Sequence, residues 1–147
     1  MENTQFNLET YLNSLPDDVE IIDLSNKNLT YIPSLKRFTK LNRLVCCYNQ
    51  LTALPELNDD LEFLSCNNNQ LTALPKLNEN LRRLNCNNNQ LTALPELNDN
   101  LYSLSCNNNQ LTHLPKLNNA LTYLYCCDNK LTSLPKLNEN LKCLAID

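Results

Sequence analysis

The sequence predicts an α/β-class solenoid with a parallel β-sheet on its concave face, extended or polyproline-like return arms on its convex face, and a short N-terminal capping helix. Five 20-residue units run from residue 41 to residue 140, each reading L-x-x-L-x-C-x-x-N-x-L-T-x-L-P-x-L-N-x-x. The Leu at the fourth place and the Cys at the sixth place alternate with outward residues, as in a strand. A unit this short, with an Asn turn and a central Pro, has no room for a helix, which averages about 11 residues. Its return arm is therefore expected to be extended.

The domain organisation follows from the repeat. Residues 1–18 are predicted to form a helical cap and residues 19–147 the solenoid. The solenoid comprises a divergent unit, five close copies and a partial unit, at residues 19–40, 41–60, 61–80, 81–100, 101–120, 121–140 and 141–147. One unit alone cannot bury its leucines, so we expect the units to stack around a continuous core.

The N-terminal segment has a helical pattern. Its apolar residues lie at helical spacing: Leu8, Tyr11, Leu12 and Leu15. We predict an amphipathic helix over residues 4–14, with Asn3 or Thr4 as its N-cap, covering the N-terminal end of the core.

The C-terminal end has no comparable cap. The last predicted strand, at residues 141–147, leaves an exposed sheet edge and unfilled leucine columns. We expect that either further chain covers this edge or a partner does, most simply a second copy of the chain in a homodimer.

The repeat resembles the leucine-rich-repeat family over residues 19–147. Its 20-residue period with L-x-x-L-P-x-L is most similar to the short bacterial subclass of secreted pathogen effectors. That subclass usually reads L-P-x-L-P, whereas this chain replaces the second Pro by Asn, at Asn58, Asn78, Asn98, Asn118 and Asn138. The resemblance implies an interaction scaffold that acts on a host target. Because some such effectors carry a ubiquitin-ligase domain after the repeats, the recognition arm of a truncated effector enzyme is an alternative.

Composition and charge exclude several function classes. A net charge of −4 gives no attraction to phosphate, so no nucleic acid is expected as a partner. The apolar runs are too short for a bilayer and the N-terminus lacks a Sec-type signal, so we expect no membrane contact and a location in the chain's own or a host cytosol. The chain has 27 Asn and no Gly, which predicts that Asn occupies the left-handed turn positions. This bias is also typical of an A+T-rich genome, such as that of a bacterium or a giant DNA virus.

The cysteines form a column that suggests either a metal or disulfide site or a reduced core. The column contains Cys46, Cys66, Cys86, Cys106 and Cys126. Neighbouring strands place such residues in a line about 4.8 Å apart, which suits neither tetrahedral zinc nor disulfide geometry. We therefore predict no metal, no cofactor and a buried thiol column, with Cys47, Cys127 and Cys143 as incidental surface thiols. Intermolecular pairing through Cys143 at the open edge is an alternative.

Two polar features repeat with the leucines. One Asn column is predicted to bond buried backbone groups in the turns, as a ladder of Asn49, Asn69, Asn89, Asn109 and Asn129. The Asn pairs that precede it and the Thr column can also form regular polar rows. A structural solenoid that orders water or binds a glycan or ice is therefore a second alternative, although turns favour Asn without any such role.

The outward strand positions vary most among otherwise similar units. They carry Arg and aromatic types that are enriched at binding hot spots. The candidate partner-binding residues are Arg43, Phe63, Arg82, Arg83, Tyr102, Tyr123 and Tyr125. Outward strand positions also favour aromatic residues for structural reasons, so that explanation stays open. No nucleophile–base pair or phosphate loop is evident, and the sequence predicts a non-enzymatic protein that binds a protein partner of unknown identity.

Replacing Asn89 by Ala should lower the free energy of unfolding by about 1–3 kcal/mol, because buried backbone groups would lose their partners. Thermal and urea unfolding measure this, with Gln90→Ala beside it as the control. An unchanged unfolding transition would contradict the ladder assignment.

Overall fold

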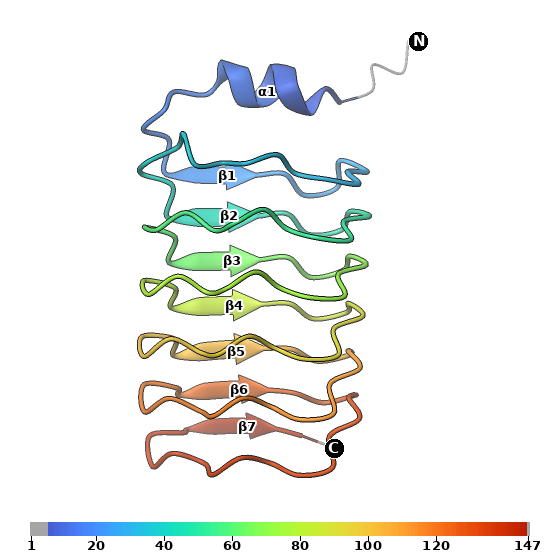
Figure 1. The fold of residues 1–147 in the computed structure, drawn as a ribbon, viewed down its shortest axis with the longest axis vertical. Helices are drawn as coiled ribbons and strands as arrows, with labels where there is room; N and C mark the ends of the chain where they lie inside the picture. The colour runs from blue at the N-terminus through green and yellow to red at the C-terminus, as the bar shows by residue number, and fades with distance from the viewer. Residues whose placement is uncertain (1–5, 147) are drawn as a thin grey trace.

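A computed structural model describes residues 6–146 and has the predicted solenoid architecture (Figure 1). One helix, α1 (Leu8–Ser14), precedes seven strands that form a single parallel sheet in chain order. The strands are β1 (Ile21–Asp23), β2 (Arg43–Val45), β3 (Phe63–Ser65), β4 (Arg83–Asn85), β5 (Ser103–Ser105), β6 (Tyr123–Tyr125) and β7 (Cys143–Ala145). Within the described residues the return arms contain neither helix nor strand, so each coil is one short strand and one extended arm.

The register of the sheet brings equivalent residues of successive units side by side. Leu44 pairs with Leu64, and Leu64 pairs with Leu84. The central residue of each strand points into the core and its two neighbours point outward, because successive strand side chains alternate. Backbone hydrogen bonds extend the pairing past the strands; the Cys86 N–H, for example, donates to the Ser105 carbonyl at 2.8 Å. Residues at the same place in successive units therefore lie side by side in the structure.

The core lies between the sheet and the return arms. The inward strand residues from β1 to β6 are at most 2% exposed: Ile22, Leu44, Leu64, Leu84, Leu104 and Leu124. Burying each such side chain contributes about 1.5–3 kcal/mol, so this column supplies much of the stability. The last coil is less covered, since Leu144 is 36% exposed and Ile146 is 41% exposed.

Helix α1 covers the N-terminal end of this core (Figure 1). Leu8 and Leu12 are buried against the first coil. The Arg37 guanidinium donates to the Leu12 carbonyl and pairs with Asp17 at 3.1 Å, which joins the helix segment to the first return arm. The helix is too short to cross a bilayer, and residues 6–146 hold no other helix that could.

The predicted helix over residues 4–14 is wrong at its start. Asn7 is the N-cap, and its side-chain oxygen accepts a hydrogen bond from the Thr10 N–H at 2.9 Å. Because this Asn satisfies a free N–H of the first turn from an extended backbone conformation, the helix begins only at Leu8. The predicted caps Asn3 and Thr4 lie outside the described residues.

The turn after each of the strands β1 to β6 uses the left-handed backbone region, and Asn occupies most of these positions. The residues with φ between 53° and 57° are Asn26, Asn28, Tyr48, Asn68, Asn88, Asn108 and Asp128. Asn tolerates this region better than other residues that carry a β-carbon. In this glycine-free chain, Asn therefore takes the place that Gly usually fills in such turns.

The predicted Asn column joins neighbouring coils. The side-chain oxygen of Asn89 accepts from the Leu71 N–H at 3.0 Å, and its amide donates to the Cys66 and Cys86 carbonyls at 3.1 Å. Equivalent bonds to the preceding and the same coil are made by Asn49, Asn69, Asn109 and Asn129. Each amide thus satisfies backbone groups at the carboxyl end of two strands.

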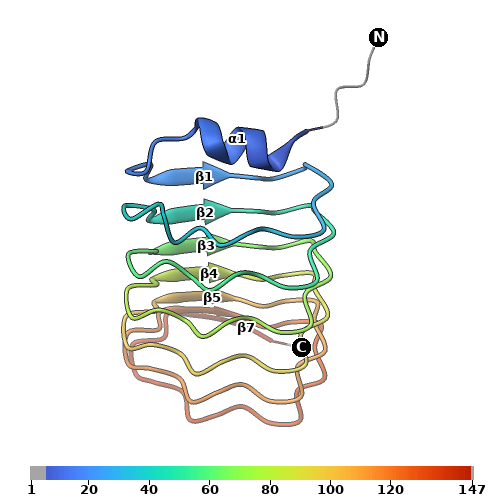
Figure 2. The same ribbon diagram turned by 45° about the horizontal axis from the view of Figure 1, so that its top comes forward.

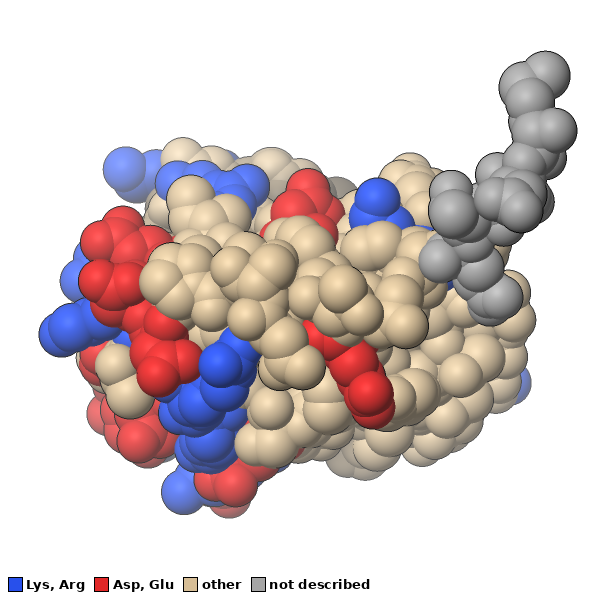
Figure 3. All heavy atoms as spheres, turned by 90° about the horizontal axis from the view of Figure 1, so that it is seen from above, with Lys and Arg blue, Asp and Glu red and all other residues tan. Residues whose placement is uncertain are grey.

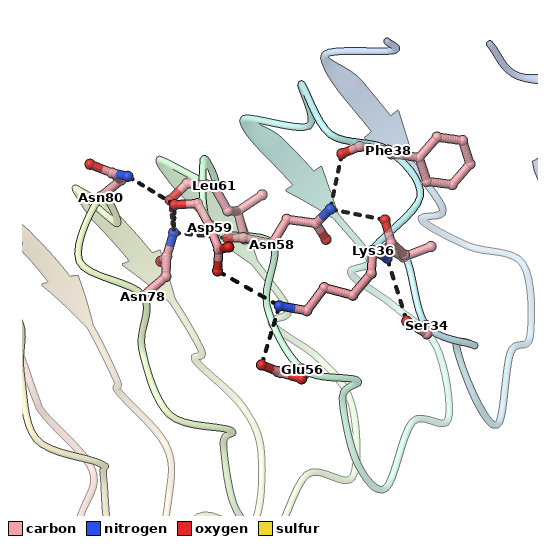
Figure 4. A network of polar contacts seen from close by, with 10 residues as sticks. Ser34, Lys36, Phe38, Glu56, Asn58, Asp59, Leu61, Asn78 and Asn80 are labelled. Atoms are coloured by element: carbon pink, nitrogen blue, oxygen red, sulfur yellow. Dashed lines mark hydrogen bonds and ion pairs between the residues drawn. The ribbon is translucent and has the colours of Figure 1, made fainter. Parts of the chain in front are cut away.

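A second Asn ladder lies at the amino end of the strands, at the positions where the sequence departs from L-P-x-L-P. The Asn58 amide donates to the Leu35 carbonyl at 2.9 Å and the Phe38 carbonyl at 3.0 Å (Figure 4). The Asn98 amide donates to the carbonyls of Asn78 and Leu81 in the same way. Proline has no donor, so Asn at this position adds bonds between coils that proline cannot make. Both ends of the strands β2 to β6 are therefore held by Asn side chains, and the outward side chains of these strands extend from a fixed backbone.

Replacing Asn98 by Ala should lower the free energy of unfolding by about 1–3 kcal/mol, because the Leu81 carbonyl and the Asn100 N–H would lose their bonds to the buried Asn98 side chain. Urea unfolding followed by circular dichroism measures this. Asn100→Ala is the matched control, since the Asn100 amide makes an exposed bond to Glu79. Equal losses in the two variants would contradict a special role for the second ladder.

Candidate functional site

The candidate site lies on the outward face of the sheet. Figure 2 shows the strands on one side of the solenoid and the return arms on the other. The third place of each unit opens its strand, and the strand pairing aligns Arg43, Phe63, Arg83, Ser103 and Tyr123 in one outward column. Arg82 and Tyr102 belong to the adjacent column, one residue before β4 and β5.

Five of the seven candidate residues surround one hollow of about 360 Å³. It spans the strands β2 to β5 and is lined by Asn42, Arg43, Glu62, Phe63, Arg82, Arg83 and Tyr102. Asn42 and Glu62 were not selected from the sequence, because neither is a hot-spot residue type. The signal for Glu62 was its place beside Arg82 in the same column. The hollow is shallow and polar, which suits a peptide or protein surface better than an enclosed small molecule.

Two arginines in the hollow stack on aromatic rings of the next coil. The Arg43 guanidinium carbon lies 4.0 Å from the Phe63 ring centroid, and that of Arg83 lies 5.0 Å from the Tyr102 centroid. The Arg83 Nε also donates to the Tyr102 hydroxyl oxygen. Such cation–π contacts contribute about 0.5–1 kcal/mol at exposed sites. They orient both guanidinium groups and leave donor edges facing solvent.

The third arginine is held differently. Arg82 Nε lies 3.6 Å from the Glu62 carboxylate, and both side chains are more than half exposed. An exposed pair of this kind contributes only about 0.2–1 kcal/mol. Its main effect is local, because Glu62 offsets one of the three positive charges around the hollow.

The remaining candidates, Tyr123 and Tyr125, lie on β6 outside the hollow. Tyr123 is 39% exposed, and Tyr125 is half-buried. A side-chain hydrogen bond with Cys143 on β7 raises the pKa of the Tyr125 hydroxyl. The structure therefore divides the predicted set into an arginine-rich hollow and a tyrosine pair toward the last strand.

The charged residues outside the hollow include mixed acidic and basic clusters. Seen from the N-terminal end, acidic and basic side chains lie side by side along one rim (Figure 3). Lys36 pairs with Glu56 at 3.2 Å and with Asp59 at 3.7 Å. Within residues 6–146, no ion pair joins successive members of the return-arm column Glu56, Lys76, Glu96, Lys116 and Lys136. This column is a solvated surface.

The column cysteines are buried thiols. The Sγ atoms of four of them donate to carbonyls of the next coil, as Cys86 does to Ser105 at 3.5 Å; the other three are Cys46, Cys66 and Cys126. Burial raises the pKa of the Cys86 thiol to about 12, and it also raises the pKa values of Cys46, Cys66 and Cys106. No group of three or more His, Cys, Asp or Glu side chains in the described part of the chain is placed to hold a metal ion.

Cys47 is not the surface thiol that the sequence suggested. It is only 6% exposed, and its Sγ lies 3.1 Å from the Ser65 Oγ and 2.8 Å from the Asn67 Oδ1. The turn after β2 bends this side chain toward the polar groups of the next coil, which strand alternation alone does not predict. Cys127 and Cys143 are half-buried.

In the Asn pairs that precede the ladder residues, such as Asn87 and Asn88, the first Asn makes hydrogen bonds within the solenoid. The Asn87 Oδ1 accepts from the Asn107 N–H at 2.7 Å and from the Ser105 hydroxyl at 2.9 Å. The second Asn of the pair, such as Asn88, occupies the left-handed turn position. These contacts give the Asn pairs a structural role. The Thr column is exposed, and its proposed ordering of water, glycan or ice stays a prediction.

Comparisons with known proteins identify a matching family model and similar solved structures. Residues 59–99 match the family model described as leucine rich repeats in two copies. YopM from Yersinia enterocolitica is 39% identical with a TM-score of 0.86, over 95% of this chain and 31% of that one. YopM from Yersinia pestis, described as a leucine-rich effector protein, is 31% identical with a TM-score of 0.75, over 94% and 45%. This chain thus spans less than half the length of either.

A Shigella effector leucine-rich-repeat domain is 23% identical with a TM-score of 0.68, over 87% of this chain and 74% of that one. This likeness concerns the fold alone. Among curated protein sequences, none matches the chain.

Alkylation should separate the two classes of thiol. Near pH 8.5, iodoacetamide should label Cys127 and Cys143 in the native chain and leave the six buried cysteines unmodified until denaturant is added. The thiolate is the reactive form, and a pKa of about 12 keeps Cys86 protonated at this pH. Mass spectrometry of the digested protein locates the labels. Native labelling of Cys86 as fast as Cys127 would contradict the buried thiol column.

Proposed function

We propose, from the premise that this chain belongs to the leucine-rich-repeat family, that it is a non-enzymatic scaffold that binds a protein partner through its concave strand face. The observation that carries the proposal is the hollow across β2 to β5, where variable outward positions place three arginines and two aromatic rings together. Arg and aromatic side chains are the types that supply most binding energy at protein interfaces.

The backbone beneath this face supports the proposal. Both Asn ladders bond main-chain groups of neighbouring coils, so the outward side chains are displayed from a rigid surface. A partner that binds a preformed surface loses less free energy to ordering than one that must first organise it. Variation at the outward positions then changes the partner without changing the fold.

The resemblance to bacterial effectors supports a more specific proposal, in which the chain is a pathogen protein that acts on a host target. YopM from Yersinia pestis is described as an effector, and its 31% identity extends over 94% of this chain. A cytosolic location, in the source cell or in a host, suits the buried thiols, because reducing compartments preserve them. The glycine-free, Asn-rich composition suits a viral source as well as a bacterial one.

The exposed edge at β7 is a second contact surface within this proposal. Leu137, Leu144 and Ile146 are 36–41% exposed, whereas the corresponding Leu117, Leu124 and Cys126 of the preceding coil are at most 5% exposed. A further coil or a second copy of the chain would cover these side chains and pair with the free strand edge.

A site-specific crosslinker tests the proposal. We expect p-benzoylphenylalanine in place of Ser103, beside Tyr102 on the outward face, to capture a discrete protein from a eukaryotic cell lysate. The same probe in place of the exposed return-arm residue Thr92 is the positional control. Adding Arg83→Ala and Tyr123→Ala should abolish capture, because both hot-spot side chains flank position 103 in the column. Equal capture at both positions, or capture that survives the double substitution, would refute the concave face as the binding surface.

A further inference from the structure

We infer that the hollow across β2 to β5 binds an acidic, extended peptide segment of the partner, with carboxylates on Arg43 and Arg83. This inference rests on the proposed function and adds the chemistry of the partner to it. The arguments come from the open donors of the two arginines, from their spacing and from the local charge.

Among the described residues, Arg43 and Arg83 each have a stacking partner but no ionic one. Within residues 6–146, the ion pairs of arginine are Arg37 with Asp17 and Arg82 with Glu62. The Phe63 and Tyr102 rings contact the guanidinium faces, and the tyrosine hydroxyl takes one donor of Arg83. A guanidinium has further N–H donors in a fork arrangement that matches a carboxylate. Arg43 and Arg83 can therefore each bind a carboxylate through two hydrogen bonds without rearranging.

The spacing of the two arginines suits an extended segment that runs across the strands. Arg43 and Arg83 occupy the same register position on β2 and β4, with Phe63 of β3 between them. Neighbouring strands lie about 4.8 Å apart, so the two positions are roughly 10 Å apart. A polyproline II segment returns every third side chain to the same face after about 9 Å. Acidic residues at every third position of such a segment would meet Arg43 and Arg83 in turn.

The charge of the hollow contrasts with that of the whole chain. Three arginines and one glutamate line it, although the chain has a net charge of −4. The Glu62 carboxylate is engaged with Arg82, which leaves the positive charges of Arg43 and Arg83 unopposed in the hollow. The basic patch is short and the chain is acidic elsewhere, which favours an acidic peptide over a nucleic acid, since nucleic acids need many phosphate contacts.

Fluorescence anisotropy with synthetic peptides tests the inference. The probe is a fluorescein-labelled peptide of Glu-Pro-Pro triplets, and its Gln-Pro-Pro counterpart is the neutral control. The full chain should bind the Glu peptide at least about ten-fold more tightly than the Gln peptide, with the difference shrinking as salt is added. Equal affinity for the two peptides would overturn the inference.

Matched variants locate the effect. Arg43→Gln with Arg83→Gln should remove the preference for the Glu peptide, whereas Lys116→Gln with Lys136→Gln removes the same charge from exposed return-arm positions and should leave it within about two-fold. Glu62→Gln should tighten binding several-fold, because it frees Arg82 and removes the one carboxylate of the hollow. Equal losses in the two double variants, or tighter binding of a single-stranded oligonucleotide than of the Glu peptide, would overturn the inference.

These outcomes are separate from the test of the proposed function. If a protein is captured at position 103 but the Glu peptide is not preferred, the proposed binding through the concave face is supported and the acidic peptide is contradicted. Equal capture at positions 103 and 92 would contradict both the proposed function and the inferred acidic partner.

Discussion

Every coil of this solenoid must satisfy its backbone N–H and C=O groups without a helix, and asparagine amides meet that constraint. A coil with a three-residue strand leaves most of its main chain outside the sheet. Unpaired polar groups next to the core would cost free energy comparable to lost hydrogen bonds. Asn89 follows the carboxyl end of β4, and Asn98 precedes the amino end of β5. The side chain of each bonds to main-chain groups of two neighbouring coils. The leucine columns can stay buried because these amides close the turns around them.

The same constraint connects the fold to the concave face. Because the amides fix each coil against the preceding one, the strands stay in register and their outward columns stay aligned. Arg43 reaches the Phe63 ring and Arg83 reaches the Tyr102 ring only because residues one unit apart are held on adjacent strands. The ladders are nearly invariant from coil to coil, while the outward positions differ. Stability and recognition are thus assigned to different columns of one repeat.

Much of the fold could be predicted because the repeat converts sequence position into spatial position. Leu64 and Leu84 share a place in the unit, and they are partners in the sheet. The start of α1 and the burial of Cys47 were missed, because each depends on local hydrogen bonds, of Asn7 and of Asn67, that periodicity does not encode. The outward columns identified the arginines and aromatic residues of the candidate site. Their stacking and the Arg82–Glu62 pair depend on side-chain conformations that no pattern specifies.

The second ladder has a consequence for how such a chain can grow. Asn58, Asn78 and Asn98 each donate to the coil before them with side-chain atoms of a single 20-residue unit. A duplicated unit therefore contains the Asn donor that bonds it to the preceding coil. It also presents the same carbonyl acceptors to the unit that follows. Gene duplication can lengthen the molecule one coil at a time without any compensating change elsewhere, and each new coil adds a fresh set of outward positions on which selection can act.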